Sequence, residues 1–231
     1  MSSRVNFPPS VDAGFKVKRL VPDKAIFWPT AIGYGNISES GDSTKFPLLT
    51  AIKARKSAKS VEPLGAFVDT AGKSLDRIWV LDDYLFKNRE DSPLQNRIDQ
   101  VLMWFPDNLT TSDVRLLTSS IGDNYAENDI RRQFEDRASQ INRQRQNRDN
   151  SLLVQIKFTL QKEFPYIHDR FAIIDDELWH FGATVGGLHD QVNAATRGWD
   201  ANDHNAIEFF NMAWAGDSDL THSHDYRGRR S

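Results

Sequence analysis

Three polar residues stand at the start of an apolar run: His168, Asp169 and Arg170 precede the segment 171–174. In an extended strand successive side chains alternate between the two faces, so His168 and Arg170 point together and Asp169 points away. An imidazole can attack phosphorus or shuttle a proton, and a neighbouring guanidinium can hold the non-bridging phosphate oxygens. The spacing therefore predicts a phosphate-handling site. The alternative is a polar strand end in which the pair forms salt bridges with Asp169 or Asp176.

The residues that follow are expected to complete this site. Asp175 ends the apolar run with the parity opposite to that of the pair, so we expect it to brace the following turn. The segment 177–184 is expected to return as a neighbouring strand. It would bring the Thr184 hydroxyl close to the pair, and Gly182 would let a backbone approach closely. His180 on this strand either faces the same cleft or is a core histidine.

The order and spacing of these residues resemble a known signature. The pattern His168-x-Arg170-x(4)-Asp175-x(6)-Gly182-Ala183-Thr184 resembles the HxKxxxxD…GS signature of the phospholipase D superfamily. Arginine stands at the usual lysine position, alanine replaces the usual serine, and Gly186 stands where the family has asparagine. The motif looks closer to a variant subgroup of compact bacterial phospholipase D-like proteins. A related domain of a eukaryotic membrane-trafficking protein has lost catalysis and binds lipid headgroups.

The resemblance covers the segment 62–214, where Asp82, Asp83 and Tyr84 look like the Asp-x-Tyr-like end of an early family strand. Enzymes of this superfamily use two motifs: one histidine becomes the phospho-enzyme and the other is the general acid. Because this chain has one motif, the resemblance implies a homodimer in which the same patch meets itself, or a partner subunit. It also implies that a downstream carboxylate, for which Glu208 is the candidate, orients His168. It implies neither a metal nor a cofactor.

Alternating strand and helix patterns must position these residues. Strands are expected at 15–21, 64–70, 76–85, 113–120, 151–160, 167–175 and 177–184. Helices are expected at 92–105 and 127–148, with a short one within 46–60. These patterns predict an α/β fold, in which helices flank a mixed β-sheet of about six to eight strands. The resemblance implies that this fold is a single phospholipase D-like domain. The strand of His168 should be central, and the helix 127–148 should cover one face.

Composition limits the remaining choices. Among 231 residues, 39% are hydrophobic, which is enough for a packed core, and the net charge of −3 argues against coating nucleic acid by bulk charge. The chain has no cysteine, which excludes disulfides, thiol catalysis and cysteine-based zinc sites. No run approaches the roughly 18 apolar residues of a membrane span, so we expect a cytoplasmic protein. We expect residues 1–61 to form an extension packing on the core, and 215–231 a flexible tail.

The sequence leaves three functions open. The first is a metal-independent, nuclease-like phosphodiesterase that works through a phosphorylated His168, as a homodimer or with a partner subunit. The second is a catalytically degenerate module that binds nucleic-acid or lipid-headgroup phosphates within a larger bacterial assembly. The third is a structural interaction domain. The basic stretch 142–148 either meets phosphates or is an ordinary solvated surface.

Overall fold

The computed structural model describes residues 20–29, 48–57, 62–87, 93–145, 150–189 and 192–216. Several sequence expectations lie outside these ranges: the tail from residue 217 onward, most of the extension 1–61, and the basic stretch beyond Arg145. The expected strand 15–21 also lies mostly outside them, and its described residues, Leu20 and Val21, are not in a strand. None of the helices within the described ranges is long and apolar enough to cross a membrane.

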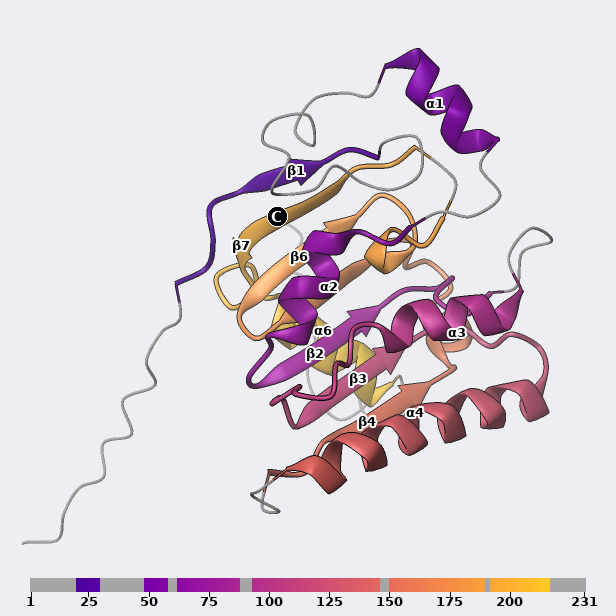
Figure 1. The fold of residues 1–231 in the computed structure, drawn as a ribbon, viewed down its shortest axis with the longest axis vertical. Helices are drawn as coiled ribbons and strands as arrows, with labels where there is room; N and C mark the ends of the chain where they lie inside the picture. The colour runs from indigo at the N-terminus through magenta and orange to yellow at the C-terminus, as the bar shows by residue number, and fades with distance from the viewer. Residues whose placement is uncertain are drawn as a thin grey trace, which may run out of the picture.

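A mixed seven-stranded sheet forms the centre of the molecule (Figure 1). Strands β2, β3 and β4 pair in parallel, and every other neighbouring pair is antiparallel. In spatial order the strands are β1 (Ala25–Phe27), β7 (Ala195–Asp200), β6 (Glu177–Phe181), β5 (Phe171–Ile174), β2 (Arg77–Leu81), β3 (Asp113–Leu117) and β4 (Leu153–Lys157). The predicted α/β class with a mixed sheet is confirmed, and β5, which follows His168, is the middle strand.

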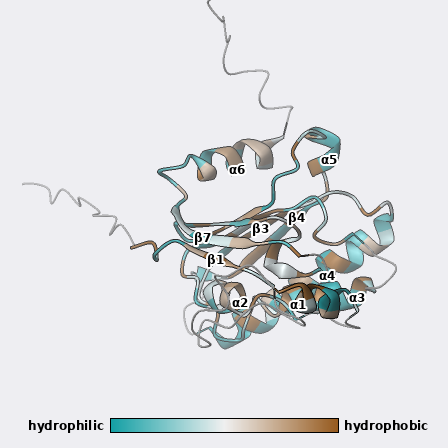
Figure 2. Cartoon of the chain, turned by 90° about the horizontal axis from the view of Figure 1, so that it is seen from above, coloured by the Kyte–Doolittle hydropathy of each residue, from teal (hydrophilic) through white to brown (hydrophobic). Residues whose placement is uncertain are grey.

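Helices cover both faces of the sheet (Figure 2). One side carries α1 (Leu49–Lys56), α2 (Gly65–Gly72), α3 (Leu94–Leu102) and α4 (Asn124–Gln144), and the other carries α5 (Leu160–Glu163) and α6 (Ala206–Ala215). Successive residues of β2 serve the two layers alternately. Ile78 and Val80 belong to the core beneath α2–α4, whereas Trp79 and Leu81 belong to the core beneath α5 and α6. The side to which a residue points therefore follows from its parity along its strand.

Helix α4 shows why the long helical prediction held. The Asp123 side chain caps its start by accepting the backbone N–H groups of Tyr125 and Ala126 at 2.9 and 3.2 Å. A stripe along one side of the helix is buried and packs toward the sheet: Ile130, Phe134, Ala138 and Ile141. Capping and apolar spacing thus agree with the observed element, which covers one face of the sheet as expected.

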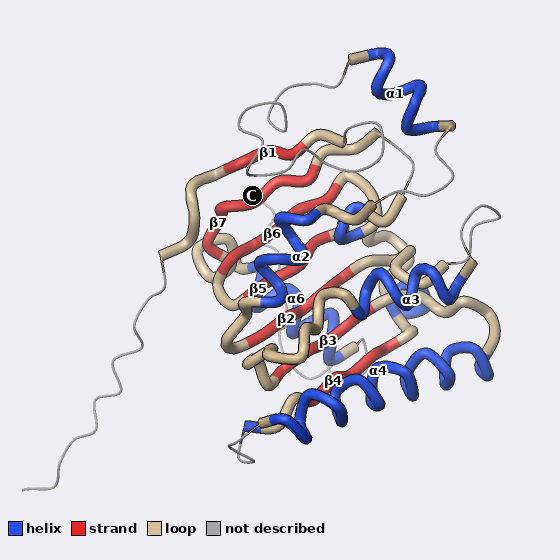
Figure 3. The backbone as a smooth tube through the Cα atoms, viewed as in Figure 1, coloured by secondary structure: helices blue, strands red, loops and turns tan. Residues whose placement is uncertain are grey.

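Two predicted strands differ from the structure (Figure 3). The segment 64–70 forms α2 instead, because Leu64, Phe67 and Ala71 lie on one helical side and are all buried. The strand expected at 167–175 begins only at Phe171, which pairs with Leu81, the last residue of β2. Beyond Leu81 the chain turns away, so residues 168–170 have no neighbour in β2. Strand β7 and helix α6 were not predicted.

Candidate functional site

Arg170 lies immediately before β5, beside the end of β2. Its guanidinium carbon is 4.5 Å from the centroid of the Tyr84 ring, and its Nε is 3.7 Å from Oδ1 of Asp82. The distance to Asp82 makes this an ion pair rather than a hydrogen bond. The side chain keeps 21% exposure, and its guanidinium donates no hydrogen bond to any residue in the described ranges. Arg170 is therefore a cation that is held in place while its N–H donors stay unused.

Asp82 is the fully buried anion beneath Arg170. Its Oδ1 accepts the backbone N–H of Tyr84 at 2.8 Å, and its Oδ2 accepts the backbone N–H of Val185 at 2.7 Å. Burial raises the pKa of Asp82 to about 6, against the lowering effect of those two hydrogen bonds and of the charges on Arg170 and Arg97. Asp82 thus ties the end of β2 to the loop that follows β6.

A second cation shares the Tyr84 ring. Lys87 Nζ lies 4.3 Å from the ring centroid and 3.8 Å from Oδ2 of Asp83. Asp83 is itself buried and accepts the hydroxyl hydrogen of Ser119. The sequence pointed to Asp82, Asp83 and Tyr84 as a strand end but gave no reason to include Lys87. We call Arg170, Lys87 and the exposed His168, two residues before Arg170, the Arg170 surface.

Buried donors hold the loop that carries the family-like Gly-Ala-Thr segment. Arg97 of α3 donates to the carbonyl of Leu188, and Arg55 of α1 donates to the carbonyl of His189 at 2.7 Å. Both arginines are buried, as is Thr184 at the start of this loop. Thr184 precedes Val185, so it lies at the same end of the sheet as Arg170. Neither Arg55 nor Arg97 had been singled out from the sequence.

Gly182 allows the close approach that its sequence position suggested. A Cβ atom at this residue would lie 3.2 Å from Oδ1 of Asn193 and 3.4 Å from the carbonyl oxygen of Ala194. Its backbone N–H donates to that same carbonyl at 3.0 Å. Gly182 is thus engaged with the segment leading into β7, and its role here is packing between backbones.

His168 is exposed and makes no hydrogen bond or ion pair with the residues that the structure describes. Glu208, expected to orient it, is an exposed residue of α6 and does not hydrogen-bond to His168. The imidazole is therefore open to solvent, and the expected orienting contact is not made in this structure.

His180 lies on the opposite side of the sheet from Arg170. It alternates in β6 with Trp179 and Phe181, which face the α2–α4 layer, so it faces the α5–α6 side. There its Nε2 lies 2.6 Å from Oδ1 of Asp169, and both side chains are well exposed. This exposed polar pair replaces both sequence interpretations of His180, a shared cleft with Arg170 and a core position.

Asp175 braces the far end of the sheet. It has a left-handed backbone with φ of 55°, in the turn between β5 and β6. Its carboxylate accepts the Ser74 hydroxyl at 2.9 Å and the backbone N–H groups of residues 75–77 at 2.7 to 3.2 Å. These bonds brace the turn between β5 and β6, as the sequence predicted, and they attach it to the start of β2, which it did not predict. Asp175 is separated from Arg170 by the length of β5.

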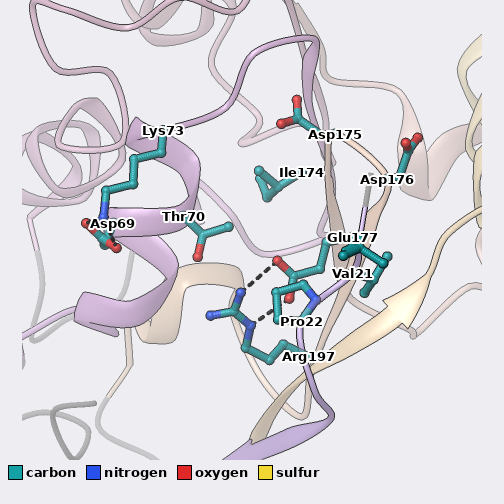
Figure 4. A pocket seen from close by; sticks show the side chains of 11 residues that line it. Val21, Pro22, Asp69, Thr70, Lys73, Ile174, Asp175, Asp176, Glu177 and Arg197 are labelled. Carbon is teal, nitrogen blue, oxygen red and sulfur yellow. Dashed lines mark hydrogen bonds and ion pairs between the residues drawn. The ribbon is translucent and has the colours of Figure 1, made fainter. Parts of the chain in front are cut away.

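A cavity of about 310 Å³ lies at this same far end (Figure 4). At its floor Arg197 donates two hydrogen bonds to the Glu177 carboxylate, at 2.6 and 2.9 Å. Burial raises the pKa of Glu177, and the bonds from Arg197 oppose that rise. The cavity is lined by Leu20, Val21, Pro22, Asp69, Thr70, Lys73, Ile174, Asp175, Asp176, Glu177 and Arg197. It is separate from the Arg170 surface because the two lie at opposite ends of β5.

No protein-family model and no curated protein matches this chain. Among solved structures it is similar to that of TrmBL2, an archaeal chromatin protein described as showing a novel mode of DNA binding, with 13% identity and a TM-score of 0.33. The match covers 64% of this chain and 46% of that one, so this chain spans less than half of that structure's length. Similarity at this level assigns neither a family nor a function.

Within the described ranges, no group of three or more His, Asp or Glu side chains is placed to hold a metal ion. The chemistry that the site offers is instead that of charged hydrogen bonds. Two cations contact one aromatic ring, a buried carboxylate lies beneath one of them, and the exposed His168 precedes Arg170 by two residues. Such a surface suits an anionic group that accepts several hydrogen bonds.

Proposed function

We propose that this chain is a single-motif phospholipase D-like module that binds phosphate groups of nucleic acid at the Arg170 surface. The observation that carries the proposal is the state of Arg170. Its guanidinium is held between Asp82 and the Tyr84 ring, yet it donates no hydrogen bond within the described part of the chain. A planar guanidinium with free N–H groups matches the oxygen geometry of phosphate.

The energetic argument starts from the orientation of the Arg170 guanidinium. Its Nε is buried and faces Asp82, so a phosphate can be accepted only by the N–H groups on its outer side. A phosphate oxygen there would form a charge-assisted hydrogen bond, which contributes about 1.5–3 kcal/mol. Lys87, at 31% side-chain exposure and beside the same ring, would add a second positive charge. A phosphate at this position would therefore meet the charges of both Arg170 and Lys87.

Binding is favoured over cleavage by the surroundings of His168. A phospho-histidine mechanism needs a positioned imidazole and a second acid. His168 has no hydrogen bond to Glu208, and the chain contains one motif. We take nucleic acid as the source of the phosphate, and a lipid headgroup is the other outcome that the test below separates.

The test measures binding of labelled single-stranded DNA and RNA by fluorescence anisotropy, at low salt and in EDTA. Arg170→Gln should lower the affinity about 10- to 100-fold, as expected for one charge-assisted hydrogen bond with its charge, and Arg170→Lys should retain part of it. The matched control is Arg132→Gln. Arg132 lies on α4, is 71% exposed and pairs with Asp129, so its loss should change affinity less than about twofold.

Three outcomes would redirect the proposal. Equal affinities of wild type and Arg170→Gln would remove the Arg170 surface from the argument. Binding to phosphatidic acid vesicles but not to oligonucleotides would identify a lipid headgroup as the ligand. Cleavage in EDTA that disappears in His168→Ala would instead establish a metal-independent phosphodiesterase, with a second chain supplying the acid.

A further inference from the structure

Asp82 cannot touch a ligand itself, because its side chain is fully buried. Both carboxylate oxygens are already engaged, Oδ1 with the N–H of Tyr84 and Oδ2 with the N–H of Val185. Its remaining close neighbour is Arg170, at 3.7 Å. Asp82 can therefore act on a phosphate in two ways: by holding the Arg170 guanidinium, whose outer side is accessible to solvent, and by its own charge at a distance.

We infer that Asp82 sets the strength of this phosphate site: its carboxylate positions Arg170, and its charge competes with the bound phosphate for the guanidinium. The inference rests on the proposed function and deepens it. Both effects arise from the contact between Asp82 and Arg170, because an anion that holds a cation in place also neutralises part of its charge. The site then binds phosphate most strongly when Asp82 is uncharged but is still held in place by the N–H groups of Tyr84 and Val185.

The charge of Asp82 can change under mild conditions. Burial raises its pKa to about 6, so Asp82 carries a proton in slightly acidic solution and loses it toward neutral pH. The charged groups that act on it are Arg170 before β5 and Arg97 on α3. The neighbouring Asp83 is engaged with Ser119 and Lys87, which leaves Asp82 as the buried anion facing Arg170.

The size of the effect follows from Coulomb's law. A phosphate accepted by the outer side of the guanidinium would lie roughly 7 Å from Asp82, one hydrogen-bond length beyond the ion pair. Two like charges at that separation, with a dielectric between those of water and of a protein surface, change a binding constant by about tenfold. Phosphate affinity should thus fall about tenfold as the pH rises from about 5 to about 7.5.

The experiment compares two chains, one with Asp82 and one with Asp82→Asn. Both also carry His168→Asn, because histidines change charge in the same pH range. The probe is a fluorescent oligothymidylate, whose phosphodiesters and bases keep their charge over this range. With Asp82 present, affinity should fall about tenfold between the two pH values. With asparagine it should be flat and close to the tighter value. A role confined to stability would change the melting temperature and leave both slopes equal.

Calorimetry in two buffers of different ionisation enthalpy gives a second readout. Near pH 6, binding should take up part of a proton in the chain with Asp82 and none in Asp82→Asn. If Asp82→Asn does not fold, the absence of proton uptake by the chain with Asp82 overturns the inference by itself. Equal pH slopes in the two chains also overturn it while leaving phosphate binding intact. A wild-type chain that binds no oligonucleotide at any pH overturns the proposed function together with the inference.

Discussion

Gly186 allows a sharp test of how the loop above Asp82 is held. It has φ of +79°, and a Cβ atom at this position would lie 2.7 Å from Cζ2 of Trp104. Trp104 is fully buried, and its ring packs edge-on against Phe67 with centroids 5.0 Å apart, so it has little room to move. The Gly186 carbonyl also accepts the N–H of Leu64 at 2.8 Å. Any side chain here must therefore displace Trp104 or break that bond.

We expect Gly186→Ala to lower the free energy of unfolding by about 2–5 kcal/mol. About 1–2 kcal/mol comes from the left-handed backbone, and about 1–3 kcal/mol comes from overpacking against Trp104. The matched control is Gly122→Ala, because Gly122 has φ of +81° but a Cβ atom there would meet nothing within 4 Å. It should show the backbone contribution alone. Asparagine is the residue type that the phospholipase D resemblance expects at this position. Gly186→Asn should lose nearly as much stability as the alanine variant, because asparagine tolerates the left-handed backbone but its side chain still overlaps Trp104.

Urea denaturation followed by tryptophan fluorescence measures all three variants. If Gly186→Ala is no less stable than Gly122→Ala, the loop does not press against Trp104 as the structure shows. The account of how the Val185 N–H is delivered to Asp82 would then fail as well, because the same loop carries both contacts.

Two further predictions concern the carboxylates of Asp82 and Asp175. Burial raises the pKa of Asp82 from 3.8 to about 6, so folding takes up a proton between these values. The resulting stability is fully present below pH 3.8 and is lost as the pH rises through about 6. Between about pH 4.5 and pH 7, the unfolding free energy of wild type should fall by about 2 kcal/mol relative to that of Asp82→Asn. Urea titrations at the two pH values measure this difference, and a constant difference would contradict the raised pKa. Asp175→Ala should lower the free energy of unfolding by about 2–4 kcal/mol, because it leaves the N–H groups of 75–77 without this acceptor, whereas the Ser74 hydroxyl can still donate to the Arg77 carbonyl. Thermal melts measure this loss, and a melting temperature within a degree or so of wild type would show that water replaces the carboxylate.

The sequence predicted the elements whose periodicity is long or strongly capped. Helix α4 has an apolar stripe over several turns and an aspartate cap, so local signals and tertiary packing agree. Short segments were ambiguous because a few apolar residues fit both periods. The segment 64–70 became α2 since a helix buries Leu64, Phe67 and Ala71 together. Strand β7 was missed because Gly198, with φ of +93°, interrupts its alternation at the irregular pairing with β6.

The candidate site was predictable in its parts and not in its arrangement. The sequence spacing identified Arg170 and Asp175 and assigned them different roles. In the structure Arg170 forms an ion pair with Asp82, and Asp175 forms hydrogen bonds at the turn. The same reasoning placed His180 in either of two positions, and the structure shows a third, paired with Asp169. The pairing register of β5 with β2 decides which of these side chains meet. A local sequence pattern does not determine that register.

The two neighbouring aspartates after β2 show why register matters for the chemistry. In the sequence, Asp82 and Asp83 are two equivalent carboxylates at a strand end. In the structure, Asp82 continues the alternation of Val80 and meets the Val185 loop and Arg170, whereas Asp83 meets Ser119 and Lys87. Each acid therefore anchors a different cation, and both cations contact the Tyr84 ring. The two acids diverge at the turn that follows β2, so adjacent residues anchor two different cations, and the end of β2 shapes the Arg170 surface as much as the residues before β5 do.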